Sequence, residues 1–143
     1  MSAAVVAISS SLLVGMSGVA SATAGQCAGG ANGFVDIPDD LTGTVVRQSD
    51  GGDLTLEVGI VKGVKRGWAR AHGNEVALGP DTSVWMDWSQ DGGNTWLQCG
   101  PFSPTDYRFS ITSAAKSTNP SPSWRFRAGA RFNGCCQVLT SWY

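Results

Sequence analysis

Charge is absent from the first 24 residues of this sequence. An apolar run from Val5 to Val14 is followed by small residues that end in Ala22-Thr23-Ala24. This order is typical of a secretory signal peptide and its cleavage site, although the basic residue usual near its start is missing. We therefore predict that residues 1–24 are an export signal and that residues 25–143 form a secreted, extracellular domain with no membrane contact after cleavage. An uncleaved anchor helix is the alternative, which the Ser and Gly residues in the run disfavour.

The chain also lacks an excess of basic residues and the common signatures of catalysis. Its formal net charge is −1, with 10 Lys and Arg against 11 Asp and Glu. Nucleic-acid-binding domains concentrate positive charge, so we expect no nucleic-acid partner. His72 is the one histidine, and no G-x-S-x-G or H-E-x-x-H sequence occurs. We therefore predict no catalytic residue and no cofactor, with a glycosidase that uses two carboxylates as an alternative.

Four cysteines, Cys27, Cys99, Cys135 and Cys136, follow the predicted signal. An even number of cysteines in an exported chain usually indicates disulfides. A bond between adjacent cysteines is strained, and neighbouring side chains in a strand point to opposite faces. We therefore predict that Cys27 and Cys99 each pair with one of the two adjacent cysteines, and we leave the choice open. A metal site of Cys135, Cys136 and His72 is a weaker alternative because no CxxC spacing is present, so we expect no metal.

No long stretch has the periodicity of a helix, and 19 glycines and 6 prolines interrupt the chain. Residues 25–33 are expected to be a flexible arm, and the Pro- and Ser-rich residues 114–123 a polar loop too hydrophilic to be buried. Apolar and polar residues alternate in short segments, which we predict to be strands: 53–61, 67–72, 82–88, 95–99, 107–113, 124–131 and 136–143. This spacing predicts an all-β domain, a single antiparallel β-sandwich or small barrel, with about two disulfides.

One short motif is specific: residues 89–96 fit the pattern S-x-D-x-G-x-T-W. Asp91 can accept hydrogen bonds from the turn that follows it, and Gly93 can adopt a positive φ. Ser89 and Thr95 stand at the two ends of the stem, and Trp96 supplies apolar packing. The motif resembles the Asp-box of bacterial sialidases and other secreted proteins. In those families the box stabilises a hairpin away from the active site, so the resemblance implies a structural role for Asp91.

The segment around this motif, Trp85 to Phe102, reads W-x-D-W-S-x-D-G-G-x-T-W-x-Q-C-G-P-F, and the chain ends in Trp142-Tyr143. Together these features resemble small secreted actinobacterial proteins of unassigned function. The resemblance implies a soil-type filamentous bacterium as the source and implies no chemistry. This chain departs from the pattern at Gly129, where a cysteine is expected after F-R-A, so the disulfide pairing of those proteins is not transferred to it.

Six tryptophans exceed what the core of so small a domain usually holds. Indole faces suit the C–H faces of sugar rings, and we expect some of these rings to be exposed for ligand binding. The candidate ligand-binding residues are Trp68, Trp85, Trp142 and Tyr143, and those expected in the core are Trp88, Trp96 and Trp124. We therefore predict a non-catalytic module that binds an extracellular polysaccharide or a cell-envelope polymer. The alternatives are an inhibitor of a secreted protease or other hydrolase, acting through the stiff segment Gly100 to Pro104, and a glycan hydrolase.

Overall fold

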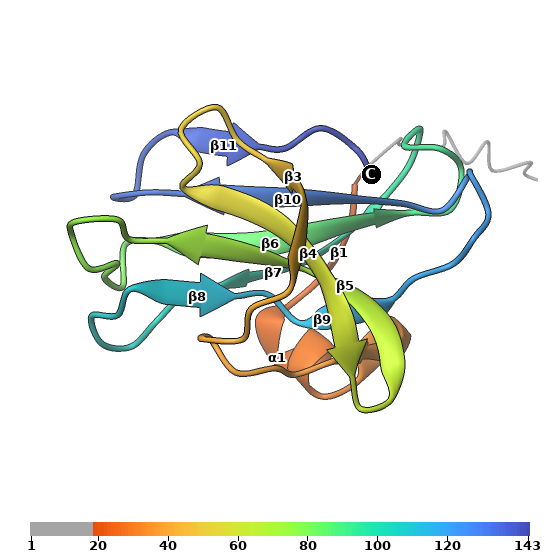
Figure 1. The fold of residues 1–143 in the computed structure, drawn as a ribbon, viewed down its shortest axis with the longest axis horizontal. Helices are drawn as coiled ribbons and strands as arrows, with labels where there is room; N and C mark the ends of the chain where they lie inside the picture. Colours follow the sequence, from red (N-terminus) through yellow and green to blue (C-terminus); the bar gives the residue numbers. More distant parts are fainter. Residues whose placement is uncertain (1–18) are drawn as a thin grey trace, which may run out of the picture.

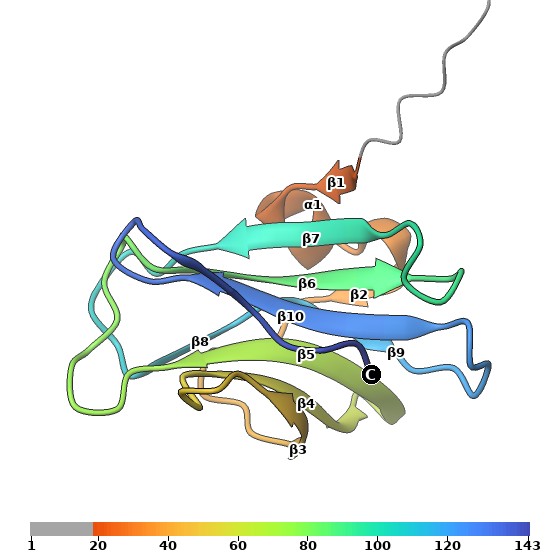
Figure 2. The same ribbon diagram turned by 90° about the horizontal axis from the view of Figure 1, so that it is seen from above.

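The computed structural model describes residues 19–143, and most of the predicted signal peptide lies outside the described residues. Two sheets face each other as two layers and form no closed barrel (Figures 1 and 2). The first has the order β1 (Ala20–Ala22), β7 (Leu97–Phe102), β6 (Ser83–Ser89), β10 (Arg125–Arg131) and β11 (Gln137–Leu139). The second has the order β2 (Phe34–Val35), β9 (Ala115–Ser117), β5 (Val64–His72), β4 (Leu54–Val61) and β3 (Thr44–Gln48), with β8 (Ser110–Thr112) also paired to β5. The predicted all-β sandwich is confirmed.

The core lies between the sheets and follows the alternation seen in the sequence. Leu54 and Leu56 of β4 are buried, as predicted, and they belong to one core cluster with side chains of the first sheet. Thr55 and Glu57, on the other face of β4, are buried as well, which the alternation did not predict. In the first sheet Met86 of β6 and Phe126 of β10 are also buried. Apolar side chains at a period of two face the core, and the opposite faces of β4 and β6 are covered as well.

Three predictions about segments are wrong. Residues 25–33 are no flexible arm, because they contain most of the helix α1 (Ala24–Ala28) and the 3₁₀ turn η1 (Ala31–Gly33). Residues 114–123 are only partly a loop, because Ala114 and Ala115 have no exposed surface and β9 pairs with both β2 and β5. Within 107–113 only β8 is a strand. The residues before it belong to a loop whose Arg108 forms a backbone bridge with Leu78, in the connection between β5 and β6.

The disulfide pairing also differs from the prediction. Cys27 bonds to Cys99 across 6.1 Å between Cα atoms, and both side chains are fully buried between α1 and β7. Cys135 bonds to Cys136. The adjacent pair lies in the exposed turn between β10 and β11, outside any strand, so the argument that their side chains point to opposite faces does not apply. The count of two disulfides is confirmed, and the expected cross-pairing is wrong.

Cleavage at the predicted site, after Ala24, would cut the chain behind the first residue of α1 and separate the helix from β1. Ala22 is buried and lies beside Cys99 in the parallel pairing of β1 with β7. Thr23 is the N-cap of α1, where its side chain accepts a hydrogen bond from the backbone of Gln26. Cleavage after Ala24 stays a prediction. Within residues 19–143, no helix has the length and apolar character needed to cross a membrane.

Candidate binding site at the aromatic end

Three connections come together at the end of the sandwich where the chain terminates (Figure 1). They are the turn between β4 and β5, the hairpin 89–96 between β6 and β7, and the loop 118–124. The amide of Gly92 in the hairpin donates to the carbonyl of Ser123 at 2.8 Å. The amide of Thr118 donates to the carbonyl of Lys65 at 3.0 Å. We call this region the aromatic end, defined by its rings: Trp88, Trp96, Trp124, Trp142 and Tyr143.

Asp91 organises the hairpin of the aromatic end. Its Oδ1 accepts hydrogen bonds from the Ser89 hydroxyl and the Thr95 amide, both at 2.8 Å, and its Oδ2 accepts one from the Thr95 hydroxyl at 2.6 Å. These bonds, that from the Thr95 hydroxyl above all, lower the pKa of Asp91 to about 2. Gly93 has a φ of 98° and donates its amide to the Ser89 hydroxyl. These are the contacts that the sequence pattern predicts for Asp91, and each serves the turn itself.

Arg127 joins the two indoles on the outer face of the first sheet. Trp96 and Trp142 lie edge to face with ring centroids 5.9 Å apart. The guanidinium carbon of Arg127 is 4.8 Å from the centroid of the Trp96 ring and 4.4 Å from that of Trp142, within cation–π range. A Cβ atom at Gly93 would lie 3.1 Å from the Trp142 indole, so the ring packs directly on the hairpin. Both indoles are therefore fixed in position and only partly exposed.

The charge on Arg127 is balanced by Asp87. Its Nε and Nη2 atoms donate to Asp87 Oδ2 at 2.9 and 2.7 Å. Asp87 is only 1% exposed, and its Oδ1 has no hydrogen-bond partner among the described residues. Burial raises the pKa of Asp87, and the bond from Arg127 opposes that rise. This ion pair joins β6 to β10 and fixes the guanidinium group that contacts the two indoles.

A pocket of about 560 Å³ opens at the aromatic end, between the two sheets. It reaches from Lys65 at the start of β5 to Arg125 at the start of β10, so each sheet contributes one cation. Its other walls include Pro120, Pro122, Trp124 and Tyr143. Tyr143 is 36% exposed, and its amide and carbonyl both pair with the backbone of Phe126. The last residue is thus held as a fixed wall of the pocket.

Lys116 supports the indole wall of this pocket from within. Its Nζ lies 4.3 Å from the ring centroid of Trp88 and 5.6 Å from that of Trp124, and it donates to the carbonyl of Asn32. The Trp88 and Trp124 rings are themselves 5.0 Å apart. Burial of the amine, together with the nearby Arg66, lowers the pKa of Lys116. Because the cation and both rings are packed together, the position of Trp124 is set before any ligand arrives.

The structure separates the four candidate ligand-binding residues. Trp142 and Tyr143 are at the aromatic end, but Trp68 is 1% exposed and Trp85 is 5% exposed. Trp68 packs with Ile37 under the segment that precedes β3, and Trp85 lies across the first sheet. Neither ring is offered to solvent, so the site described above omits them.

Gly129 explains where the Trp85 ring lies. A Cβ atom at this position would lie 2.2 Å from Trp85, so only glycine leaves space for the indole. The cysteine expected there by resemblance would need the ring to move. Sequence reasoning missed Lys65 and Arg125 as site residues and placed Trp124 in the core. The signal available for Arg125 and Trp124 was their position directly after a Pro- and Ser-rich loop.

The segment proposed for an inhibitor, Gly100 to Pro104, is largely not a loop. Its first three residues belong to β7, and Pro104 is buried. The exposed aromatic residues come just after it, with Tyr107 at 75% and Phe109 at 62% exposure. They lie in the loop 103–109, at the end of the sandwich opposite the aromatic end (Figure 1).

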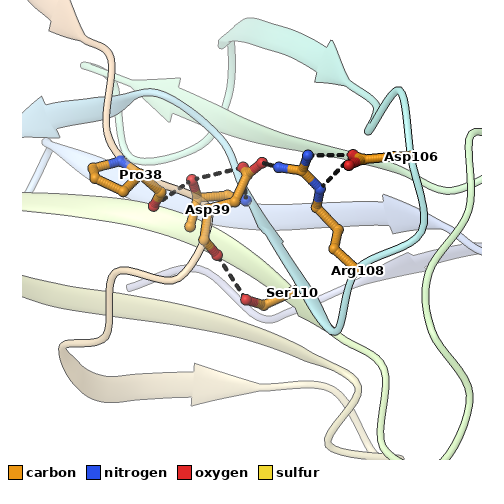
Figure 3. Close-up of polar contacts among 6 residues, drawn as sticks. Pro38, Asp39, Asp106, Arg108 and Ser110 are labelled. Atoms are coloured by element: carbon orange, nitrogen blue, oxygen red, sulfur yellow. Dashed lines mark hydrogen bonds and ion pairs between the residues drawn. The ribbon is translucent and has the colours of Figure 1, made fainter.

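The loop 103–109 is held by the side chain of Arg108 (Figure 3). Arg108 pairs with both Asp39 and Asp106, and its backbone bridges to Leu78. Asp39 is itself fixed by two hydrogen bonds. Its carbonyl accepts one from the Ser110 hydroxyl at 2.7 Å, and its Oδ1 accepts one from the backbone amide of Thr112 at 3.0 Å. The two exposed rings thus project from a restrained segment.

His72 belongs to a cluster over the second sheet. Its Nε2 lies 2.9 Å from the Thr55 hydroxyl and 3.7 Å from Glu57 Oε1. Burial lowers the pKa of His72, and the charge of Arg70 adds to the effect. Glu57 is only 2% exposed, and it also accepts from the amide of Gly43 at 2.8 Å. The hydrogen bond from Gly43 joins the segment before β3 to the sheet. Because Thr55 and Glu57 are both buried, the cluster leaves little surface for a substrate.

The pocket of the aromatic end is lined by aromatic rings, hydroxyl groups and cations, which can bind a ligand by stacking, hydrogen bonds and charge. Within residues 19–143 no three His, Cys, Asp or Glu side chains are grouped as metal ligands. The chain has no match among protein families, curated proteins or solved structures.

Proposed function

We propose that this protein is a secreted, non-catalytic module that binds an extracellular glycan or cell-envelope polymer at its aromatic end. The observation that carries the proposal is the pocket between the two sheets, in which Trp124 and Tyr143 supply ring faces and Lys65 and Arg125 supply donors. Sugars bind to such surfaces because their C–H faces stack on aromatic rings while their hydroxyl groups meet polar side chains.

The rigidity of this end supports the proposal. The walls are held by the Asp91 hairpin, by Lys116 between Trp88 and Trp124, and by backbone pairing of Tyr143 with β10. A surface that is already ordered loses little conformational freedom when a ligand binds, so more of the contact energy appears as affinity.

The two tyrosines of the chain provide a matched test. Tyr143→Ala removes a ring from the pocket, and Tyr107→Ala removes an exposed ring from the opposite end. Affinity is measured by depletion on polysaccharides and purified cell walls, with thermal melts of the same samples. We expect Tyr143→Ala to weaken binding by about 1–3 kcal/mol and Tyr107→Ala to leave it unchanged. Normal binding by a folded Tyr143→Ala variant, or absence of binding to every polymer, would contradict the proposal.

A second candidate function, inhibition of a secreted hydrolase, is favoured by the opposite end. Tyr107 and Phe109 are exposed on a segment restrained by Arg108, and rigid segments with exposed aromatic residues are effective in protein recognition. A panel of secreted proteases and glycosidases, assayed with wild type and with the Tyr107→Ala/Phe109→Ala double variant, tests it. Inhibition that disappears in the double variant would support this candidate, and no inhibition by wild type would remove it.

A further inference from the structure

We propose that the polymer bound at the aromatic end is acidic, with carboxylate or phosphate groups that are held by Lys65 and Arg125. This inference rests on the proposed function and names the ligand class of the same pocket. Its first support is the charge of the lining, which includes both cations and no carboxylate side chain among the described residues.

The second support is that no carboxylate among the described residues pairs with these cations. Within residues 19–143, Arg70, Arg108 and Arg127 each form an ion pair with a carboxylate, whereas Arg47, Arg66 and Arg131 form none. No such contact is made there by Lys65 or Arg125. Two cations that line the same pocket repel each other, and an anion bound in that pocket relieves the repulsion.

The third support is the way Arg125 is held. Its Nε donates to the carbonyl of Pro122 at 2.9 Å, which fixes the plane of the guanidinium group. Its two terminal nitrogens remain for a ligand, and this fork matches the oxygens of a carboxylate or a phosphate. The backbone of Lys65 is tied to the same loop through Thr118. The loop 118–124 therefore orients the guanidinium group of Arg125 and anchors the backbone of Lys65, and it also forms one wall of the pocket.

The charge of the molecule is divided between its two ends. The loops opposite the aromatic end carry acidic residues: Asp50, Asp53, Glu75, Asp81 and Asp106. These loops contact one another through Asn74 with Asp53 and through the bridge between Leu78 and Arg108. Arg108 and Arg131 also lie at that end, and Asp91 lies at the aromatic end, so the division of charge is uneven rather than complete. The two cations of the pocket attract acidic polymers over a distance of about 10 Å at moderate salt.

The experiment compares three soluble polymers: polygalacturonate for carboxylate, poly(glycerol phosphate) for phosphate, and dextran as the neutral control. Affinity for each is measured by calorimetry at low and high salt. The test variants are Lys65→Met and Arg125→Gln. Arg131→Gln is the matched control, because Arg131 is an exposed arginine at the other end of the same strand and its loss changes the net charge equally.

We expect at least one acidic polymer to bind more tightly than dextran, with an affinity that falls as salt rises. Lys65→Met and Arg125→Gln should each weaken this binding by about tenfold or more, and Arg131→Gln by less than about twofold. The polymer that binds better identifies carboxylate or phosphate as the recognised group. Equal binding of dextran with no effect of Lys65→Met or Arg125→Gln would overturn this inference and leave the proposed function standing. Equal losses in all three variants would also overturn it, and absence of binding to any polymer or cell wall would overturn both.

Discussion

Arg127→Met is the perturbation whose effect on stability can be estimated most directly. The substitution keeps an unbranched side chain between the indoles of Trp96 and Trp142 and removes the charge. Asp87 then stays 1% exposed, and it loses both hydrogen bonds to its Oδ2 while its Oδ1 already lacks a partner. Removing one member of a buried ion pair destabilises a protein by about 3–5 kcal/mol, because a charge is left buried without compensation. For a domain of this size the melting temperature should fall by about 10–20 °C.

The pH dependence of the same variant gives a second readout. Burial raises the pKa of Asp87 in the folded protein above its usual value, so the folded state holds its proton to a higher pH than the unfolded chain does. Stability therefore decreases as pH rises from the unfolded pKa through the folded one, and it is regained on acidification. Without Arg127 the folded pKa of Asp87 rises further, so acidification should stabilise the variant more strongly than it stabilises wild type.

Urea denaturation at several pH values measures both effects, and a double variant isolates the pair. Asp87→Leu/Arg127→Met removes the buried charge with its partner, so it should be more stable than Arg127→Met alone. Refutation would be an Arg127→Met variant within about 1 kcal/mol of wild type, or a double variant no more stable than the single one.

Three further outcomes are expected. Intact mass and peptide mapping of protein from culture supernatant should show a start at or near Gly25, no free thiol, and the pairs Cys27–Cys99 and Cys135–Cys136; a mass that includes residues 1–24, or a Cys27–Cys135 peptide, would contradict this. Gly129→Ala should destabilise the domain by about 1–3 kcal/mol in urea melts because its Cβ would meet Trp85, and unchanged stability would show that the ring moves freely. Asp91→Ala should lower the melting temperature above about pH 4, with the difference shrinking as pH falls towards 2, since the pKa of Asp91 is lowered to about 2; a difference independent of pH would argue against the carboxylate as the cause.

The parts of the fold that could be predicted from sequence are those fixed by near neighbours. The alternation from Leu54 to Val58 places the apolar side chains on one face of β4 and the polar Thr55 and Glu57 on the other, and a shift of one residue would exchange the two faces. The turn around Asp91 is predictable for a similar reason, because the side-chain hydrogen bonds of Asp91 all lie within residues 89–95. Such features need no knowledge of the rest of the molecule.

The features that could not be predicted depend on distant partners. Whether Trp85 is exposed is decided by Gly129, which is brought beside it by the pairing of β6 with β10. Lys116 is buried in a segment of polar composition because Trp88 and Trp124 surround its amine, and no property of the segment itself reveals those rings. The disulfides have the same character, since the burial of Cys27 beside Cys99 depends on α1 packing on β7.

The two candidate functions place recognition at opposite ends of one sandwich, and the chemistry of the ends differs. Tyr143 stands beside unpaired cations, whereas Tyr107 stands beside an arginine that two carboxylates already neutralise. A ligand that binds more weakly as salt rises and is lost with Tyr143 must therefore occupy the aromatic end. A partner whose binding is lost on substitution of Tyr107 and unchanged on substitution of Arg125 must occupy the other end. Because each end keeps its own rings and its own hydrogen bonds, a substitution at one leaves the other intact, and the two functions can be tested in the same protein.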